Sequence, residues 1–236
     1  MQAYKRILLK LSGESLAGTQ ENGIQTEALL GFAQQIKQVA DLGIEVAIVI
    51  GGGNIFRGLQ GEGKGFDRVI GDQMGMLATT INSLALQSAL ESIGKTTSLY
   101  TAIRMEPVGE FYSKRKAITA LKNGHIVIVS GGTGNPYFTT DTASALRAIE
   151  LEVDAFFKAT RVDGIYTADP EKDKSAKKYD SLTYMEAIQK NLKVMDITAF
   201  SLCKENKMPI IVFDINNEKN LPGIIHGEKI GTKVSE

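Results

Sequence analysis

The stretch that most restricts the fold of this chain is residues 44–50, IEVAIVI, in which only Glu45 is polar. A half-exposed strand would alternate apolar with polar residues, so this run predicts a central strand covered by helices on both faces. Similar apolar segments alternate with segments of helical period almost from end to end of the chain. The alternation predicts an α/β fold, a three-layer αβα sandwich with a mainly parallel central sheet.

The other elements are predicted from the same two periodicities. Thr26 is expected to cap a helix that stops at Gly43, and Asp72 to open a long helix that reaches Ser92. Further strands are predicted at residues 4–11, 97–102, 126–129, 155–159 and 209–213, and further helices at 113–122, from Thr140, at 182–189 and at 197–205. No composition break marks a linker, and the polar run 170–179 fits a surface excursion. Residues 1–236 are therefore expected to form a single domain.

Composition narrows the possible partners. The 27 Lys and Arg balance 27 Asp and Glu, which disfavours a strongly basic nucleic-acid-binding protein. No apolar run approaches the ~20 residues of a membrane span, and the N-terminal apolar stretch is too short for a secretory signal, so a cytoplasmic protein without a membrane partner is expected. The single cysteine, Cys203, lies in an apolar-periodic stretch and is expected to be buried and unreactive. His125 and His226 stand apart, so no protein-held metal site is expected.

Glycine-rich loops directly follow three of the predicted strands: SGES at 12–15, GGGN at 51–54 and GGTGNP at 131–136. In open parallel sheets ligands bind beyond the carboxyl ends of the strands, so the three loops are expected to converge on one crevice. A bound phosphate needs several backbone N–H groups at close range, which side chains at the loop would obstruct. Any one of these loops alone would more often be a simple tight turn, but three in register predict a polyphosphate site.

Two common phosphate motifs do not account for these loops. The dinucleotide fingerprint G-x-G-x-x-G is absent after the first strand, which makes a Rossmann-type site improbable. Gly58, Gly63 and Lys64 satisfy G-x-x-x-x-G-K, but Gly65 follows where a Mg²⁺-binding hydroxyl is needed, and no strand immediately precedes Gly58. We interpret this match as a coincidence in a glycine-rich loop.

Acidic residues near the loops have two interpretations each. Asp141, just after Thr139 and Thr140, could be an ordinary helix-start residue stabilised by the macrodipole, or a site residue. The stretch KATRVDGIYTADP, residues 158–170, could likewise be a plain pair of turns. Residue chemistry alone leaves these alternatives open.

Taken together, the motifs YKRILLKLSGE, VIGGGNIFRG, GDQMGMLAT, GTGNPYFTTD, KATRVDGIYTADP and LKVMD, in this order, resemble the bacterial uridylate kinases of the amino acid kinase family. The resemblance runs from Tyr4 to GEKIGT near the C-terminus. It implies the amino acid kinase-like fold and transfer of phosphate from ATP to UMP. The GGGN-x-FRG and GTGNP-x-FTTD motifs separate the uridylate kinases from acetylglutamate, aspartate and carbamate kinases of similar fold.

The same resemblance implies roles for individual residues. The residues implied to bind ATP are Lys10, Leu11, Ser12, Gly13, Gly53, Arg57, Thr160, Tyr166 and Asp169. Those implied to bind UMP are Gly52, Asp72, Thr133, Gly134, Asn135, Pro136, Tyr137, Phe138, Thr139 and Thr140. Lys10, Arg57 and Asp141 are the expected catalytic residues, and Lys158 is a further candidate cation. Mg²⁺ is expected to arrive with ATP, keeping most of its waters.

The expected reaction is in-line transfer that gives ADP and UDP, as a step of pyrimidine nucleotide biosynthesis. It needs no general base, because the UMP phosphate is already ionised. Two alternatives remain: another kinase of the family acting on a carboxylate or carbamate, and a non-catalytic nucleotide-binding protein of the same fold. The resemblance also implies a homohexamer and inhibition by UTP. It leaves GTP activation and the role of the loop 18–23 open.

Overall fold

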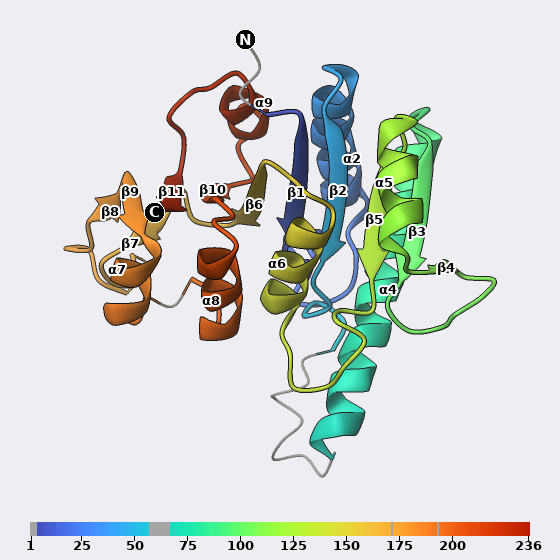
Figure 1. Ribbon diagram of the computed structural model, residues 1–236, viewed down its shortest axis with the longest axis horizontal. Coiled ribbons are helices and arrows are strands. Elements are labelled where there is room, and N and C mark those ends of the chain that lie inside the picture. Colours follow the sequence, from blue (N-terminus) through green and yellow to red (C-terminus); the bar gives the residue numbers. More distant parts are fainter. Residues whose placement is uncertain (1–3, 57–66, 171, 193) are drawn as a thin grey trace.

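The computed structural model describes residues 4–56, 67–170, 172–192 and 194–236, in which helices cover both faces of a central sheet (Figure 1). The helices are α1 (Gly13–Leu16), α2 (Thr26–Asp41), α4 (Arg68–Ser92), α5 (Lys114–Lys122), α6 (Thr140–Glu150), α7 (Tyr184–Gln189), α8 (Ile197–Glu205) and α9 (Asn220–Ile225). The strands are β1 (Arg6–Leu11), β2 (Glu45–Ile50), β3 (Thr97–Thr101), β4 (Glu110–Phe111), β5 (Ile126–Ser130), β6 (Ala155–Thr160), β7 (Ile165–Tyr166), β8 (Lys178–Tyr179), β9 (Ser181–Thr183), β10 (Ile210–Asp214) and β11 (Thr232–Ser235).

The main sheet has the strand order β4-β3-β5-β2-β1-β6-β10-β11-β9 within the described residues. Neighbouring strands run parallel throughout this order except β10 and β11, which are antiparallel. Strands β7 and β8 form a separate antiparallel pair. Because β1 lies between β2 and β6, the loops after these three strands meet at the same edge of the sheet.

The two faces of the sheet bury different side chains, since successive residues of a strand point to opposite sides. Ile7, Leu9 and Leu11 of β1 pack with α2, α4 and α9 in one apolar cluster. Leu8 packs with α5, α6, α7 and α8 in a second cluster on the other face. Lys10 shares the parity of Leu8 and therefore lies on the α6 side. These two cores confirm the three-layer αβα arrangement.

The strand predicted from IEVAIVI is confirmed as β2, and Val46 to Ile50 are at most 3% exposed. Burying one Val, Ile or Leu side chain contributes about 1.5–3 kcal/mol. Because the side chains of β2 are buried in both apolar clusters, this strand stabilises the sheet from both faces. Cys203 is buried in the second cluster, as expected, and burial raises the pKa of its thiol to about 12.

Two predicted helix starts are wrong. The long helix α4 begins at Arg68, because the Asp67 carboxylate accepts hydrogen bonds from the N–H groups of Val69 (3.0 Å) and Ile70 (3.2 Å). Asp72 therefore lies in the second turn and does not open the helix. Thr26 is the first residue of α2 and not its cap, since Gln25 occupies the cap position and makes no side-chain capping bond.

The prediction of a helix over 182–189 is wrong in its first two residues. Leu182 belongs to strand β9, and Thr183 caps α7 in a capping box with Glu186. Helix α1, directly after β1, was also not predicted, nor were helix α9 and strand β11, which follow the last predicted strand. In the described part of the chain, no helix is both long and apolar enough to cross a membrane.

Candidate active site

The loops after β1 and β2 touch each other at the carboxyl edge of the sheet. A Cβ atom on Gly13 would come within 2.5 Å of the Gly51 carbonyl oxygen, so only glycine fits there. A Cβ on Gly52 would lie 2.8 Å from the Cβ of Ala78 in α4. These contacts place the SGES loop beside the GGGN loop, as expected from their glycines, and also place the GGGN loop against α4.

Asn54 at the end of the GGGN loop holds that loop in place. Its side chain is buried, donates to the Gly23 carbonyl oxygen at 2.7 Å and accepts from the Asn82 amide of α4 at 2.7 Å. The same Asn82 amide nitrogen lies 2.7 Å from the Gly51 carbonyl oxygen. Asn54 and Asn82 therefore anchor the loop between β2 and α4.

Two of the cavities beside these loops are lined by residues expected to bind the substrates. The larger, about 750 Å³, lies beyond β1 and β6 and is lined by five of the residues expected to bind ATP: Lys10, Ser12, Thr160, Tyr166 and Asp169. The second, about 450 Å³, lies between α4 and the loop after β5 and is lined by Gly52, Gly53, Asp72, Thr133, Asn135, Phe138, Thr139 and Thr140. Glu14 lines both, so the cavities are neighbours. We call them the donor cavity and the acceptor cavity.

Not every expected site residue lines the cavity that its role would suggest. Gly53, expected on the ATP side, lines the acceptor cavity. The Tyr137 side chain is 67% exposed, and its backbone has φ 70°, in the left-handed region. Arg57, expected to contact the phosphates, lies outside the described residues, as do Gly58, Gly63 and Lys64.

Thr160 and Tyr166 of the donor cavity already make polar contacts within the chain. The Thr160 hydroxyl donates to the Val162 carbonyl oxygen at 2.6 Å and so fixes the turn after β6. The Tyr166 hydroxyl donates to the Asp163 carboxylate at 2.6 Å. Both side chains are thus held at the cavity wall before any ligand binds.

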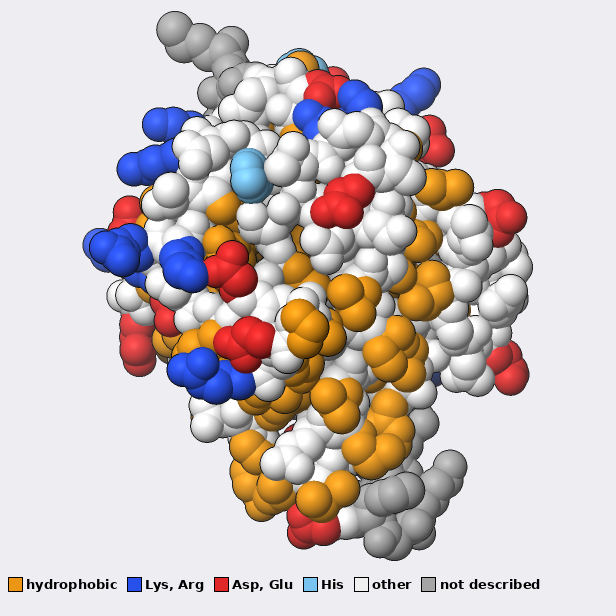
Figure 2. Space-filling view, turned by 90° about the vertical axis from the view of Figure 1, so that its right-hand side faces the viewer, with side chains coloured by type: hydrophobic (Ala, Val, Ile, Leu, Met, Phe, Trp, Pro, Cys, Tyr) orange, Lys and Arg blue, Asp and Glu red, His pale blue; other side chains and the backbone are white. Residues whose placement is uncertain are grey.

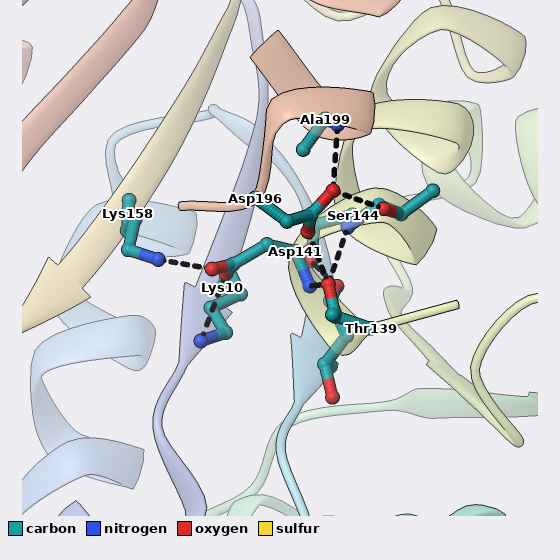
Figure 3. Close-up of polar contacts among 9 residues, drawn as sticks. Lys10, Thr139, Asp141, Ser144, Lys158, Asp196 and Ala199 are labelled. Atoms are coloured by element: carbon teal, nitrogen blue, oxygen red, sulfur yellow. Dashed lines mark hydrogen bonds and ion pairs between the residues drawn. The ribbon is translucent and has the colours of Figure 1, made fainter. Parts of the chain in front are cut away.

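An ion cluster lies where β1, β6 and the start of α6 meet (Figure 3). The Lys10 ammonium is 3.0 Å from one carboxylate oxygen of Asp141, and the Lys158 ammonium donates to the other. All three side chains are at most 15% exposed. The sequence analysis named Lys10 and Asp141 as expected catalytic residues and Lys158 as a further candidate cation, and the structure brings the three together.

Burial and charge compete in setting the pKa values of this cluster. Burial would raise the pKa of Asp141, but the neighbouring ammonium groups of Lys10 and Lys158 outweigh it and lower that pKa to about 2. Burial lowers the pKa of Lys158 to about 8, with repulsion from Lys10 adding to the effect and Asp141 opposing it. Asp141 is therefore ionised at neutral pH. The pKa of Lys158 is only about one unit above neutral pH.

Asp196 is the last residue of the LKVMD motif, and the sequence analysis gave it no role. Its carboxylate accepts from the Thr142 hydroxyl at 2.8 Å, from the Ala199 N–H at 2.9 Å and from the Thr139 hydroxyl (Figure 3). Thr139 in turn caps α6 by accepting from the N–H groups of Asp141 and Thr142. One carboxylate thus fixes the starts of both α6 and α8. An Asp placed before a helical pattern is the only signal for it in the sequence.

Asp72 has two protein partners in the acceptor cavity. It accepts from the backbone N–H of Tyr137 at 2.7 Å and forms an ion pair with Arg68 Nε at 2.9 Å. The Arg68 guanidinium also stacks over the Tyr137 ring, 5.4 Å from its centre. Asp72 and Arg68 therefore tie the loop after β5 to α4, and sequence reasoning missed Arg68.

The side chains of the site offer few ligands of the kind that Mg²⁺ prefers. Among the residues that the structure describes, no group of three or more His, Cys, Asp or Glu could hold a metal ion. Mg²⁺ commonly binds through one or two carboxylates together with substrate phosphates and keeps several waters. The residues present fit an ion that is carried by a nucleotide.

Glycine-rich loops at the carboxyl edge of the sheet, two neighbouring cavities and a buried lysine-aspartate cluster at the donor cavity fit a site for phosphorylated ligands. The model of the amino acid kinase family matches residues 5–214, and the chain belongs to that family. Within it, the chain is 62% identical to a uridylate kinase of Phocaeicola vulgatus over 99% of both chains. It is 61% identical to a uridylate kinase of Porphyromonas gingivalis, over 100% of this chain and 98% of the relative.

A solved structure gives the same result. The UMP kinase of Bacillus anthracis superimposes with a TM-score of 0.95 at 44% identity, covering 98% of this chain and 96% of that one. The predicted fold and the resemblance to uridylate kinases are thereby confirmed. The chain is a kinase.

Proposed function

We propose that this enzyme transfers the γ-phosphate of ATP to UMP and releases ADP and UDP, as a step of pyrimidine nucleotide biosynthesis. The observation that carries the proposal is the position of the ion cluster. Lys10 and Lys158 line the donor cavity, while Asp141 directly follows Thr139 and Thr140 of the acceptor cavity. The names of the full-length relatives support UMP as the acceptor.

Positioning and charge neutralisation supply the catalysis in this proposal, because the ionised UMP phosphate is already a nucleophile. Lys10 points from the end of β1 into the donor cavity, where charge develops on the transferred group. Asp141 holds the Lys10 ammonium at that point. Arg57 would offset the repulsion between the two anionic substrates.

The nucleotides are proposed to bind on opposite sides of this cluster. ATP would contact Lys10, Ser12, Thr160, Tyr166 and Asp169 in the donor cavity. Mg²⁺ bound to the ATP phosphates would neutralise part of their charge. UMP would lie against Gly52, Asp72 and the loop 133–140, with its ribose toward Asp72.

A screen of phosphate acceptors tests this function. The purified chain is incubated with ATP, Mg²⁺ and one of UMP, CMP, acetylglutamate, aspartate or carbamate, and ADP formation is followed. UMP should be used far better than the others. A preference for a carboxylate or carbamate, or no ADP with any acceptor, would replace the proposal by one of the two alternatives.

We also propose that the chain self-associates, with a homohexamer as the expected assembly. Exposed Ile70, Leu77, Ile81 and Leu84 follow one face of α4 and are 40–50% exposed. Figure 2 shows hydrophobic side chains gathered on the side of the molecule where α4 lies. An apolar stripe of this kind is typical of an interface between copies. Light scattering measures the molecular mass of the assembly for the wild type and for Ile81→Glu. The variant should form a smaller assembly.

Three further expectations belong to this proposal. The enzyme is expected to act in the cytoplasm, and its residues are expected to form one domain. Inhibition by UTP is expected, because UTP is an end product of pyrimidine nucleotide biosynthesis and carries the same uridine group as UMP. Whether GTP activates is decided by adding GTP to the same assay.

A further inference from the structure

Both protein partners of Asp72 bind the same oxygen of its carboxylate. Arg68 Nε donates to Oδ2 at 2.9 Å, and the backbone N–H of Tyr137 donates to the same Oδ2 at 2.7 Å. Within the described part of the chain, Oδ1 of Asp72 has no hydrogen-bond partner, although the side chain is only 14% exposed and lines the acceptor cavity. The protein therefore occupies one oxygen and leaves the other for a ligand.

The position of Arg68 in α4 is a poor one for a residue that only stabilises its helix. Arg68 is the first residue of α4, and Asp72 lies four residues later. A helix N-terminus carries partial positive charge, which disfavours a cation there, and an ion pair at this spacing is more favourable when the acidic residue comes first. The order found here adds little to the stability of the helix, so the pair is better explained by a role in the cavity.

Arg68 also holds the loop that carries Tyr137. Its guanidinium lies over the Tyr137 ring, 5.4 Å from the ring centre, while Nε donates to Asp72. The Tyr137 backbone has φ 70°, a left-handed conformation that costs a non-glycine residue free energy and persists only where the surroundings hold it. Because the Tyr137 side chain is 67% exposed, core packing contributes little, and the contacts with Arg68 and Asp72 hold the residue in place.

We propose that Arg68 is a positioning residue for the sugar of the acceptor nucleotide: together with the Tyr137 N–H it binds Oδ2 of Asp72 and so presents Oδ1 to a ribose hydroxyl. The inference rests on the proposed function, because a ribose enters this cavity only with a nucleotide acceptor. The χ2 torsion of an aspartate is broad, so a carboxylate that has lost one of its two partners turns more freely. Without Arg68, Oδ1 is no longer held at one position in the cavity.

A direct contact between Arg68 and the phosphate of the acceptor is the competing explanation, since Arg68 also lines the acceptor cavity. The two explanations predict a different dependence on the substrate. A residue that positions Asp72 assists UMP, whose 2′-hydroxyl donates to Oδ1, more than dUMP, which lacks that hydroxyl. A phosphate contact assists UMP and dUMP equally.

The first experiment measures kcat and KM for UMP and for dUMP with the wild type, Arg68→Met and Arg68→Lys. Arg68→Met should raise the KM for UMP by ~10-fold and narrow the UMP to dUMP ratio of kcat/KM by at least ~5-fold. Its kcat should change less than ~3-fold, because the sugar contact is the same in the bound substrate and in the transition state. Arg68→Lys should restore the ratio only in part, since an ammonium group cannot donate to Asp72 and cover the Tyr137 ring at once.

A double variant tests whether Arg68 acts through Asp72. Residues that act as one unit have non-additive effects, so adding Arg68→Met to Asp72→Ala should leave the UMP to dUMP ratio within ~2-fold of that of Asp72→Ala. Arg104→Met is the matched control, because Arg104 also pairs with a carboxylate, that of Glu106 at 3.6 Å, and lies 4.7 Å from the centre of the Phe111 ring. It should keep the wild-type ratio.

Three kinetic results would overturn the proposal: an unchanged ratio in Arg68→Met, an equal loss for UMP and dUMP, or a further loss when Arg68→Met is added to Asp72→Ala. Thermal melting adds a fourth criterion. The melting temperature of Arg68→Met should lie within ~2 °C of the wild-type value, because the pair adds little to helix stability. A much larger fall would make the pair a structural tie of α4 and would also refute the positioning role.

The last measurement uses the wild type and needs no turnover. In protein labelled with ¹⁵N-arginine, the Nε–H of Arg68 should exchange slowly with water because it is bound to Asp72, and this NMR signal should be lost in Asp72→Ala. The signal should persist when UMP binds, since Oδ2 keeps its partners. A wild type that does not bind UMP while the signal is present would refute the proposed function, whereas a wild type that binds UMP and loses the signal refutes only the positioning role.

Discussion

Asp141→Asn removes the only carboxylate between Lys10 and Lys158 among the described residues and leaves their two ammonium groups adjacent. Breaking a buried ion pair by removing one partner usually costs ~3–5 kcal/mol. Here the cost is limited, because Lys158 can release its proton. Its pKa is already about 8 with Asp141 present, and losing the carboxylate lowers it further.

The loss of the Lys158 proton determines how the stability of the protein changes with pH. The folded-state pKa of Lys158 lies below the ordinary lysine value of 10.5, so between these two pKa values the unfolded state binds more protons and stability rises with pH. In the wild type that rise begins near pH 8, and in Asp141→Asn it begins at lower pH. The stability difference between the two proteins should therefore shrink from pH 6 to pH 8 by up to about 2–3 kcal/mol, at about 1.4 kcal/mol for each pH unit.

Urea unfolding at pH 6, 7 and 8, at one protein concentration, measures this difference. Asp173→Asn serves as the control, since Asp173 is an exposed turn residue that bonds to Ser175, and its effect should not vary over this range. Activity per folded molecule of Asp141→Asn should fall by ~10²–10³ at all three pH values, as for loss of an oriented charge in a transition-state site. A stability difference that is constant or grows with pH, or an active variant, would refute the reasoning and leave Asp141 as a helix-start residue.

Three further changes test the other parts of the site. Lys10→Ala should lower kcat by ~10²–10³ with a much smaller change in the KM for UMP, measured by steady-state kinetics, and a near-normal kcat would make Lys10 a mere surface residue of the strand. Asp72→Ala should reduce kcat/KM for UMP more than for dUMP, because a carboxylate that accepts from the ribose 2′-hydroxyl distinguishes the two; an equal loss for both would remove Asp72 from the sugar site. Gly52→Ala should raise the KM for UMP, since the new Cβ would lie 2.8 Å from the Ala78 Cβ and push the loop away from α4; an unchanged KM would show that the loop does not contact the acceptor.

The pattern of apolar residues along the sequence correctly predicted the layers of the fold. The apolar run ending at Ile50 became a buried central strand, and Thr139 begins α6 as a cap, because both depend on residues close in sequence. The start of α4 was misplaced because two aspartates, Asp67 and Asp72, compete as caps, and Gly71 between them weakens the helical signal. Sequence periodicity cannot decide between such caps.

The site was predictable only in part, for a different reason. The resemblance supplied Lys10, Asp72 and Asp141, but the residues that hold them come from distant segments. Lys158 lies beside Lys10, within reach of Asp141, because β6 pairs with β1, and strand order is a property of the whole sheet. Asp196 meets Thr139 across 57 positions of chain. No local pattern encodes contacts of this kind.

The shared carboxylate of Asp196 has a mechanical consequence. Leu192 and Val194, just before it, form part of the donor cavity wall, while Thr139, which it holds, belongs to the acceptor cavity. Displacing α8 outward would break the contacts of Asp196 with Thr139 and Thr142, at about 0.5–1.5 kcal/mol for each ordinary hydrogen bond and more for a charged one. Through Asp196, a displacement of α8 at the wall of the donor cavity would be transmitted to the start of α6 beside the acceptor cavity.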